Sequence, residues 1–407
     1  MASHSDENAP IIPSNLQHRR KPQPLSRADS SDLSRWYAEV DRGLLLMIVG
    51  LMAIGLLAVA VASPVGARVA ARRGHNVPEL YYLWRQLFWV CSGLLLMLWV
   101  GLRPKFEIRK WAVIGTVVGV LALFGVLLLG HEVNGSTRWI GSGLFRLQPS
   151  EFLKPLFAVS MGWLLACGSE DEKIPAMSLS FAVTLLISIL LMSQPDFGQT
   201  VLICGTWLAM AFIAGLDLRK LAWIGGLASA GMVATYFLYA NARHRIDAFL
   251  FGAGDGGQVD RGMDTLANSG LIGSGPFTGT AKFRLPEAHT DYIYSVIGEE
   301  FGLFACASIL LLYVALVVRV LRRLREEQDQ FVILAGSGLV LQFAGQMLIN
   351  IAVNLHLLPS KGMTLPFISY GGSSLWALCL SMGMLLALTR RNPYRARPQE
   401  IAGWWEK

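Results

Sequence analysis

Long runs of hydrophobic residues recur along the chain and are separated by short polar stretches. Ten such runs lie at 44–65, 82–102, 111–130, 151–167, 177–193, 198–216, 221–240, 295–318, 331–355 and 373–388. A helix of about 20 apolar residues crosses a hydrocarbon core of about 30 Å, and most of the runs reach or approach this length. Backbone polar groups in lipid must be hydrogen-bonded within the protein, which favours helices. The pattern predicts an all-α polytopic membrane protein with about ten transmembrane helices.

The polar segments divide the chain into regions. Residues 1–40 are rich in Ser, Pro and charge without apolar periodicity, which predicts a disordered tail. Residues 41–392 form the predicted membrane domain, and residues 393–407 form a short second tail. Within the membrane domain, residues 241–294 make one long loop between the seventh and eighth runs. Loops of this length in compact proteins are usually functional or disordered.

Composition and charge agree with a membrane protein and indicate its orientation. Hydrophobic residues make up 53% of the 407 residues and charged residues 15%. With ten spans, both termini share one side, and that side holds most of the 35 Lys and Arg residues. The positive-inside rule therefore predicts cytoplasmic termini and an outer location for loop 241–294. This asymmetry accounts for the net charge of +7, so no nucleic-acid partner is needed to explain it.

Charged residues gather near the predicted outer ends of the spans. Arg138 and Arg146 precede Glu151 and Lys154, whose spacing of three residues places them on one helix face, close enough to pair. This pair is either structural or functional, because charges within spans usually face a cavity. Asp196 lies in a short loop after Pro195, where it either stabilises a turn or contributes to a site.

The densest polar stretch comes just before the eighth run. It contains Glu287, His289, Asp291, Glu299 and Glu300. A second outer segment, 359–374, contains helix-breaking Pro and Gly residues together with Lys361. Cationic side chains suit a phosphate or pyrophosphate, and a carboxylate suits a base that stays ionised near neutral pH.

Four stretches carry a family resemblance. They are LFRLQPSEFLK (144–154), MSQPDFGQT (192–200), PEAHTDYIYSVIGEEFG (286–302) and PSKGMTLPFISYGGSS (359–374). In this order and spacing they resemble the signatures of the SEDS family (shape, elongation, division and sporulation), and the resemblance covers the chain from the first span to the last. The details of 258–262, 289–300 and 360–372 resemble the division branch, FtsW, more than the elongation branch.

The resemblance implies a bacterial peptidoglycan glycosyltransferase. Such an enzyme polymerises lipid II into β-1,4 glycan strands at the outer face of the cytoplasmic membrane, here for septal wall synthesis. The implied partners are a class B penicillin-binding transpeptidase and other membrane proteins of the division complex.

The resemblance also assigns residue roles. Asp291 matches the family's essential aspartate, and Glu151 and Lys154 match an important pair in its fourth span. Because an α-linked pyrophosphate gives a β-linked product, we expect an inverting single displacement with Asp291 as general base. The expected supporting residues are His289 and Glu287, which shape its surroundings, and Glu299 and Glu300, which orient the loop.

The leaving pyrophosphate needs positive charge. The candidate cations are Arg138, Arg146, Lys154 and Lys361, with Asp196 as a further candidate substrate contact. A divalent cation, Mg²⁺ or Mn²⁺, could share this role, although the sequence shows no set of metal ligands.

Two other classes of function remain open at this stage. A lipid II flippase would also have ten spans and intramembrane charges. A non-catalytic scaffold of the division complex needs no site at all. The near absence of charges within runs two, three, nine and ten favours the enzyme, because a transport path needs charges along the membrane midplane.

Overall fold

The computed structural model describes residues 32–391, except 130, 134–135, 142–145, 172, 239–242, 244–246, 248–257, 286 and 360–361. One compact unit covers Val40–Asn392, and the second consists of Met1–Glu39 and Pro393–Lys407. In the second unit the described residues form helix α1 (Asp32–Glu39). This helix occupies 32–39 of the region 1–40, for which the sequence predicts a disordered tail, and apolar residues recur in it at helical spacing. Residues 1–31 and the predicted tail 393–407 lie outside the described residues.

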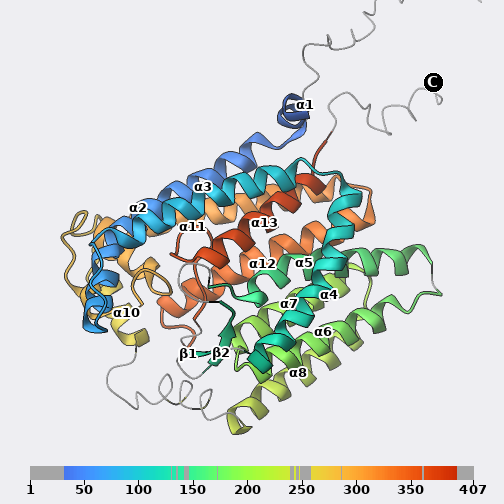
Figure 1. Ribbon diagram of the computed structural model, residues 1–407. Helices are drawn as coiled ribbons and strands as arrows, with labels where there is room; N and C mark the ends of the chain where they lie inside the picture. The colour runs from blue at the N-terminus through green and yellow to red at the C-terminus, as the bar shows by residue number, and fades with distance from the viewer. Residues whose placement is uncertain are drawn as a thin grey trace, which may run out of the picture. The chain divides into compact units, whose positions relative to one another are not determined.

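A helix occupies each of the ten hydrophobic runs in the described part of the chain (Figure 1). They are α2 (Arg42–Arg72), α3 (Tyr81–Gly101), α4 (Lys105–Leu129), α5 (Pro149–Glu170), α6 (Ala176–Ser193), α7 (Phe197–Ile213), α8 (Leu218–Leu238), α11 (Ile293–Arg325), α12 (Gln330–Asn354) and α13 (Gly372–Leu388). Among the described residues, seven of these helices are long and apolar enough to cross a membrane, and α7 and α13 are shorter apolar helices. The chain is a multi-pass membrane protein, while the count of ten spans stays a prediction.

Polar residues between the runs begin the helices. The carboxylate of Asp41 accepts a hydrogen bond from the amide of Leu44 at 3.0 Å and caps α2. Asp329 caps α12 in the same way through the amide of Phe331 at 3.1 Å. Pro149 stands in the first turn of α5, where its missing N–H removes no helical hydrogen bond.

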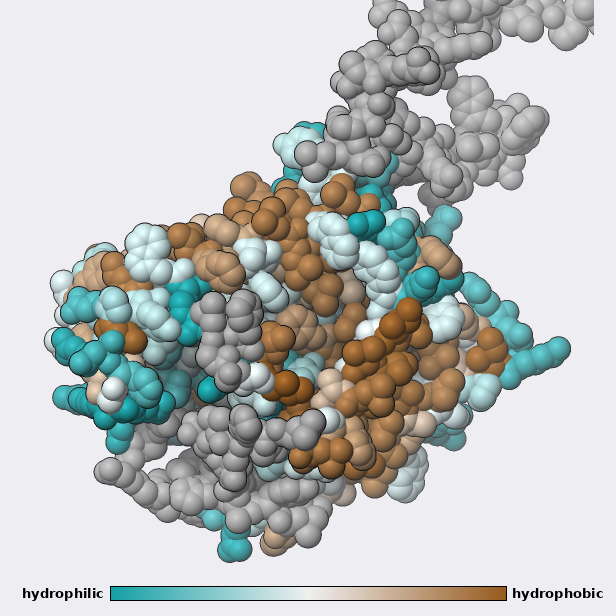
Figure 2. Space-filling model, viewed as in Figure 1, coloured by the Kyte–Doolittle hydropathy of each residue, from teal (hydrophilic) through white to brown (hydrophobic). Residues whose placement is uncertain are grey.

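Helices α5 and α12 lie at the centre of the membrane unit. Of their most apolar stretches, 61% and 67% are buried, against 22% for α4. Helices α4 and α12 pack on α5, α13 packs on α3, and α2 packs on both α3 and α11. Figure 2 shows apolar side chains gathered over the middle of the visible face, with hydrophilic side chains toward its ends. This distribution fits a unit surrounded by lipid.

The long loop before α11 contains two short helices, α10 (Gln258–Ala267) and the 3₁₀ helix η4 (Ala281–Arg284). Between these two short helices, segment 270–275 packs against a break in α11. Gly302 has φ +84 there, and a Cβ at this position would lie 2.3 Å from the carbonyl oxygen of Leu271. The amide of Ser274 donates to the carbonyl of Glu299 at 2.8 Å, and the amide of Leu303 donates to the carbonyl of Gly270 at 3.2 Å. The loop thus satisfies backbone groups that the break exposes.

Two short strands form a hairpin between α4 and α5. Strand β1 (His131–Val133) pairs antiparallel with β2 (Ser136–Trp139), and Val133 faces Ser136 in this register. The hairpin brings Arg138 to the same end of the unit as the turn between α6 and α7.

Candidate active site

A tight turn just before α11 holds the most polar stretch of the sequence. The carbonyl of Glu287 accepts hydrogen bonds from the amides of Thr290 (3.2 Å) and Tyr292 (3.3 Å). The carboxylate of Glu287 accepts a third from the hydroxyl of Thr290 at 3.1 Å. Glu287 therefore shapes the turn, and Asp291 lies half-buried at its exit, just ahead of Ile293, where α11 begins.

Two asparagines of α12 fix the position of Asp291. The side-chain amides of Asn350 and Asn354 each donate to the carbonyl of Asp291 at 2.9 Å. The Oδ1 atom of Asn354 also accepts from the amide and the hydroxyl of Ser295, at 3.1 and 2.8 Å. Because Asn350 and Asn354 lie four residues apart, they share one helix face. One face of α12 thus holds both Asp291 and the first turn of α11.

Segment 362–370, between α12 and α13, is bound to the same turn. The hydroxyl of Ser369 donates to the carbonyl of Thr290 at 2.5 Å, and the amide of Tyr370 donates to the carbonyl of His289 at 2.9 Å. These bonds join two segments that are far apart in the sequence. They form one wall of the site.

The carboxylate of Asp291 faces this segment. A Cβ at Gly362 would lie 3.7 Å from the Oδ2 atom of Asp291, and Gly362 has φ +65. Lys361, a predicted cation, directly precedes Gly362 and lies outside the described residues. A ligand that contacts the carboxylate of Asp291 would therefore also lie close to segment 362–370.

His289 is a neutral part of the wall. His289 is 8% exposed, and its ring packs against those of Tyr82 and Tyr370, with centroids 4.3 and 5.5 Å away. Burial lowers the pKa of His289 to about 4, so the imidazole is uncharged near pH 7. Its Nδ1 atom is buried and has no hydrogen-bond partner among the described residues. His289 therefore brings no positive charge to the site.

Glu151 and Lys154 form an ion pair, as their spacing allows. Their side chains meet at 2.9 Å, and both are buried. The ammonium of Lys154 also donates to the Oε1 atom of Gln346 at 2.7 Å, and Glu151 accepts from the amide of Gln199 at 2.5 Å. The amide of Gln346 in turn donates to the carbonyl of Thr364 at 3.0 Å. The pair is thus linked through one glutamine to segment 362–370.

Arg138 and Asp196 fasten the hairpin to the turn between α6 and α7. The guanidinium of Arg138 donates to the carbonyls of Gln194 (3.2 Å) and Pro195, and it lies 3.6 Å from the carboxylate of Asp196. The amide of Gln148 donates to the same carboxylate at 3.2 Å. Burial raises the pKa of Asp196, and the charge of Arg138 opposes this effect. These contacts join three segments at one end of the unit.

The predicted cations differ in how their charge is used. Carboxylates of the protein already accompany Arg138 and Lys154. Arg146 is exposed and makes no hydrogen bond or ion pair with another described residue. In the portion of the chain that the structure describes, no group of three or more His, Cys, Asp and Glu side chains is arranged to hold a metal ion.

Lys282 joins the loop before α11 to two helices, and sequence reasoning missed it. Its ammonium pairs with the carboxylate of Glu300 on α11 and donates to the carbonyl of Val61 on α2 at 3.2 Å. The carboxylate of Glu299 accepts from the amides of Ala281 (2.7 Å) and Lys282 (2.8 Å), which secures η4. Glu299 and Glu300 thus bind the loop. A single lysine in a long loop has no spacing that would have revealed it.

A polar stripe on α12 was also missed, although the sequence contains its signal. Gln342, Gln346, Asn350 and Asn354 recur every four residues in an otherwise apolar run, and all are buried. Buried amides in a membrane helix need hydrogen-bond partners. Three of the four bind the site segments described above.

Comparisons with known proteins agree with this architecture. The model of the family described as "Cell cycle protein", which groups FtsW, RodA and SpoVE, matches residues 42–394. The chain is 38% identical over 370 residues to a Caulobacter vibrioides protein named probable peptidoglycan glycosyltransferase FtsW, covering 91% of this chain and 94% of that one. It is 36% identical to a protein of the same name from Trichlorobacter lovleyi, covering 86% and 93%.

Solved structures show the same fold. A chain from a structure titled "Structural coordination of polymerization and crosslinking by a peptidoglycan synthase complex" superposes with a TM-score of 0.70 at 26% identity. The match covers 86% of this chain and 97% of that one. The rod shape determining protein RodA of Thermus thermophilus superposes with a TM-score of 0.64 at 24% identity, covering 88% and 98%. The latter likeness concerns the fold alone.

Proposed function

Because the chain belongs to the FtsW–RodA–SpoVE family of cell cycle proteins, we propose that it is a peptidoglycan glycosyltransferase of bacterial cell division. The names of its relatives support this activity, and the match covers nearly the full length of each of them. The substrate we propose is lipid II, a disaccharide-peptide carried on undecaprenyl pyrophosphate. The product is a β-1,4 glycan strand.

The observation that carries the proposal is Asp291, a carboxylate residue whose backbone is held in place just before α11. Two asparagine amides hold the carbonyl of Asp291 at 2.9 Å, while its carboxylate faces segment 362–370. A general base must be positioned to within hydrogen-bonding distance of the proton that it takes. A side chain at the end of a tail or a mobile loop would not meet that condition.

The chemistry is a single in-line displacement. The 4-hydroxyl oxygen of the acceptor sugar attacks the anomeric carbon of the donor, and the bond between that carbon and the pyrophosphate oxygen breaks. Asp291 takes the proton of the attacking hydroxyl, and undecaprenyl pyrophosphate leaves with the bonding electron pair. Because the α-linked donor gives a β-linked product, the anomeric centre inverts without a covalent sugar–enzyme intermediate.

The negative charge of the leaving group needs cations at the site. We propose Arg146 and Lys361 as its primary contacts, since the charge of Arg146 is not used by the described residues. Lys154 and Arg138 then contribute indirectly, without contacting the pyrophosphate. Lys154 positions Gln346, and Arg138 holds the turn between α6 and α7. A Mg²⁺ or Mn²⁺ ion brought by the pyrophosphate would supply further positive charge.

We further propose that the enzyme works in the bacterial cytoplasmic membrane at the division septum. A class B penicillin-binding transpeptidase is the proposed partner, together with other membrane proteins of the division complex. The similarity to a chain of a peptidoglycan synthase complex supports such a partnership.

The Glu151–Lys154 pair bears on the flippase alternative. It lies in the first turns of α5, near one end of the helix, and its contacts run toward segment 362–370. A transport path would need charges through the midplane of the membrane. The location of the pair thus favours an enzyme over a flippase.

The proposal is tested by Asp291→Asn in the purified full chain with its transpeptidase partner and lipid II. The substitution keeps the size of the side chain and removes its ability to take a proton. A positioned general base contributes about 10²- to 10⁴-fold, so polymer formation should fall at least about 100-fold. Membrane insertion and partner binding should be unchanged.

Asp264→Asn is the matched control, because Asp264 is exposed on α10 in the same loop. It should polymerise like the wild type. If Asp291→Asn also formed normal polymer, Asp291 would not be the base, and Glu299 would be the next candidate. If the wild-type pair formed no polymer but moved lipid II across vesicles, the flippase would replace the enzyme. If the wild-type pair were inactive in both assays but still bound each other, a non-catalytic scaffold would be the remaining function.

A further inference from the structure

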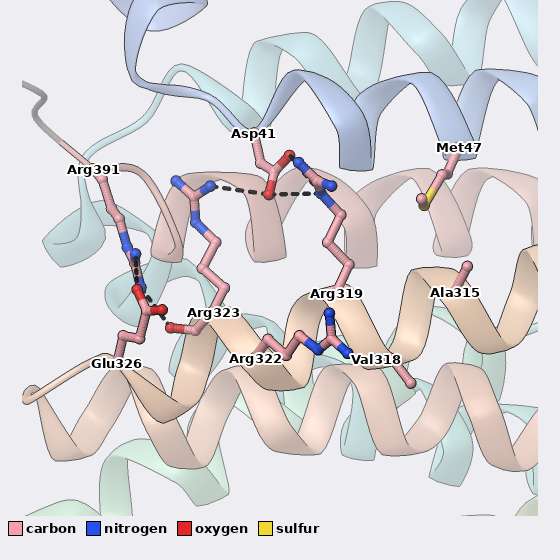
Figure 3. A pocket seen from close by; sticks show the side chains of 9 residues that line it. All are labelled: Asp41, Met47, Ala315, Val318, Arg319, Arg322, Arg323, Glu326 and Arg391. Carbon is pink, nitrogen blue, oxygen red and sulfur yellow. Dashed lines mark hydrogen bonds and ion pairs between the residues drawn. The ribbon is translucent and has the colours of Figure 1, made fainter.

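A second polar site lies at the other end of α11, away from Asp291. Nine residues line a pocket of about 500 Å³ there: Asp41, Met47, Ala315, Val318, Arg319, Arg322, Arg323, Glu326 and Arg391 (Figure 3). They come from the start of α2, the last turns of α11 and the chain just beyond α13. Helix α2 separates the two sites, because Asp41 precedes its first turn and Gly66, more than 20 residues further along it, lies beside His289. At about 1.5 Å per residue, this is a distance comparable to the thickness of a membrane.

Ion pairs organise one side of the pocket. The carboxylate of Asp41 lies 2.8 Å from Arg319 and 3.0 Å from Arg323, and Figure 3 shows it between them. Glu326 pairs with Arg391 at 2.6 Å. Burial alone would raise the pKa of Asp41. Hydrogen bonds from Arg319 and from the amide of Leu44, together with the positive charges of Arg323 and Arg319, outweigh this effect and hold the pKa below its usual value. The pocket is therefore built around an ionised carboxylate.

Positive charge remains after these pairs are counted. The lining contains four arginines and two carboxylates. Arg322 is exposed and has no hydrogen bond or ion pair with the residues that the structure describes. The side chain of Arg319 is 45% exposed, so it can contact a ligand while it keeps its bond to Asp41. An anion would find two accessible guanidinium groups here, and arginine binds phosphate oxygens in a bidentate manner.

The opposite side of the pocket is apolar. Met47, Ala315 and Val318 line it, and exposed apolar residues continue from it along both helices. Leu46 on α2 is 73% exposed and Leu311 on α11 is 67% exposed. An inorganic phosphate gains nothing from such a surface, whereas acyl chains would cover it. The site thus combines a cationic rim with an apolar wall.

We propose that this pocket binds the phosphate headgroup of an anionic phospholipid. Arg322 and Arg319 contact the phosphate, and the acyl chains lie along Met47, Val318 and the apolar residues beyond them. The lipid would belong to the leaflet at this end of the helices, the end that the basic residues predict to be cytoplasmic. Bound there, it would join α2 to α11. This proposal does not depend on the proposed enzymatic activity.

Native mass spectrometry of the full-length chain tests the proposal. The protein in mild detergent is titrated with phosphatidylglycerol or phosphatidylcholine, and bound lipids are counted. Phosphatidylglycerol should bind at lower concentration than phosphatidylcholine. Arg322→Gln should weaken phosphatidylglycerol binding about fivefold, because one arginine near an anionic lipid contributes about 1 kcal/mol. Binding of phosphatidylcholine should not change.

Arg325→Gln is the matched control, since it removes the same charge from the same helix without altering the pocket lining. It should change the affinity less than about twofold. Val318→Asn should also weaken phosphatidylglycerol binding, because it places an amide on the acyl-facing wall. Both pocket variants should melt at the temperature of the wild type.

Three results would overturn the proposal. Equal weakening by Arg325→Gln would indicate a general basic surface. Equal affinity for the two lipids would show that the headgroup charge is not recognised. Displacement of phosphatidylglycerol by millimolar inorganic phosphate, with Val318→Asn binding normally, would assign the pocket to a free anion.

Discussion

The side chain of Lys154 is almost fully buried, and both of its known partners belong to the protein. Its ammonium lies 2.9 Å from Glu151 and 2.7 Å from Gln346, which leaves it little capacity for a further ligand. The sequence favoured a direct contact with pyrophosphate. The geometry favours a different role, in which Lys154 positions Gln346 and, through it, Thr364.

We predict that Lys154→Met lowers the amount of folded protein. The substitution leaves the carboxylate of Glu151 buried without its counter-charge, and removal of one partner from a buried ion pair costs about 3–5 kcal/mol. The double variant Glu151→Leu, Lys154→Met should regain much of the lost stability, because both charges are gone. Thermal unfolding in detergent, followed by size-exclusion chromatography, measures the difference.

Lys173→Met serves as the control for Lys154→Met, because Lys173 is exposed in the turn between α5 and α6. It should melt like the wild type. If Lys154→Met instead accumulated and melted normally while polymerising poorly, Lys154 would contact the pyrophosphate directly.

At the scale of elements, the break in α11 determines where its first part points. The part of α11 before Gly302 contains Glu299 and Glu300, which bind Lys282 in the preceding loop. The part after Gly302 continues as an apolar helix. The break depends on the absence of a side chain at position 302. Segment 270–275 occupies the space that a Cβ would need.

We predict that Gly302→Ala destabilises the fold by about 2–4 kcal/mol. The substitution combines the strain of φ +84 with an overlap against the carbonyl of Leu271. Glycan polymerisation should fall as well, because the loop that carries Asp291 loses its support on α11. The midpoint of thermal unfolding and the rate of polymerisation are the measurements.

Gly50→Ala on α2 is the matched control, since a Cβ at Gly50 has no heavy atom within 4 Å. Alanine is the better helix former there, so the control should be neutral or slightly stabilising. If Gly302→Ala had the same midpoint of thermal unfolding as Gly50→Ala, the break in α11 would not require glycine at position 302.

For the whole molecule, the two polar sites lie at opposite ends of the same helices. Asp291 precedes α11, and the arginine pocket contains residues of its last turns. Because charged groups are costly in hydrocarbon, we expect each end to lie at one membrane surface. The positive-inside rule predicts that the arginine end faces the cytoplasm.

Topology is the matching prediction. Reporter tags placed within residues 1–30 and after Lys407 should report the cytoplasm, and a tag near Gly256 should report the outer side. Fusions to alkaline phosphatase and green fluorescent protein distinguish the two compartments. A cytoplasmic signal from the Gly256 position would place Asp291 on the wrong side for polymerising an externally presented substrate.

The membrane helices were predictable from local composition. Each of the ten runs holds a helix, because lipid leaves a buried backbone no other way to satisfy its hydrogen bonds. The polar stretch at 286–300 was also found, since charges are conspicuous next to apolar runs. Helix α1 was missed, because eight residues with a short apolar face lie below the length at which periodicity is decisive.

What the sequence determined by itself was thus the class of protein, the helical runs and the identity of the polar segments. Only the tertiary structure decided which of these side chains meet. Asn350 and Asn354 reach Asp291 across about 60 residues of chain, Gln346 joins Lys154 to Thr364, and Lys282 reaches Glu300 and Val61. Hydrophobic periodicity records which face of a helix is buried, and it contains no information about the neighbour. That neighbour is set by how the helices pack, and packing depends on the shapes of all side chains together.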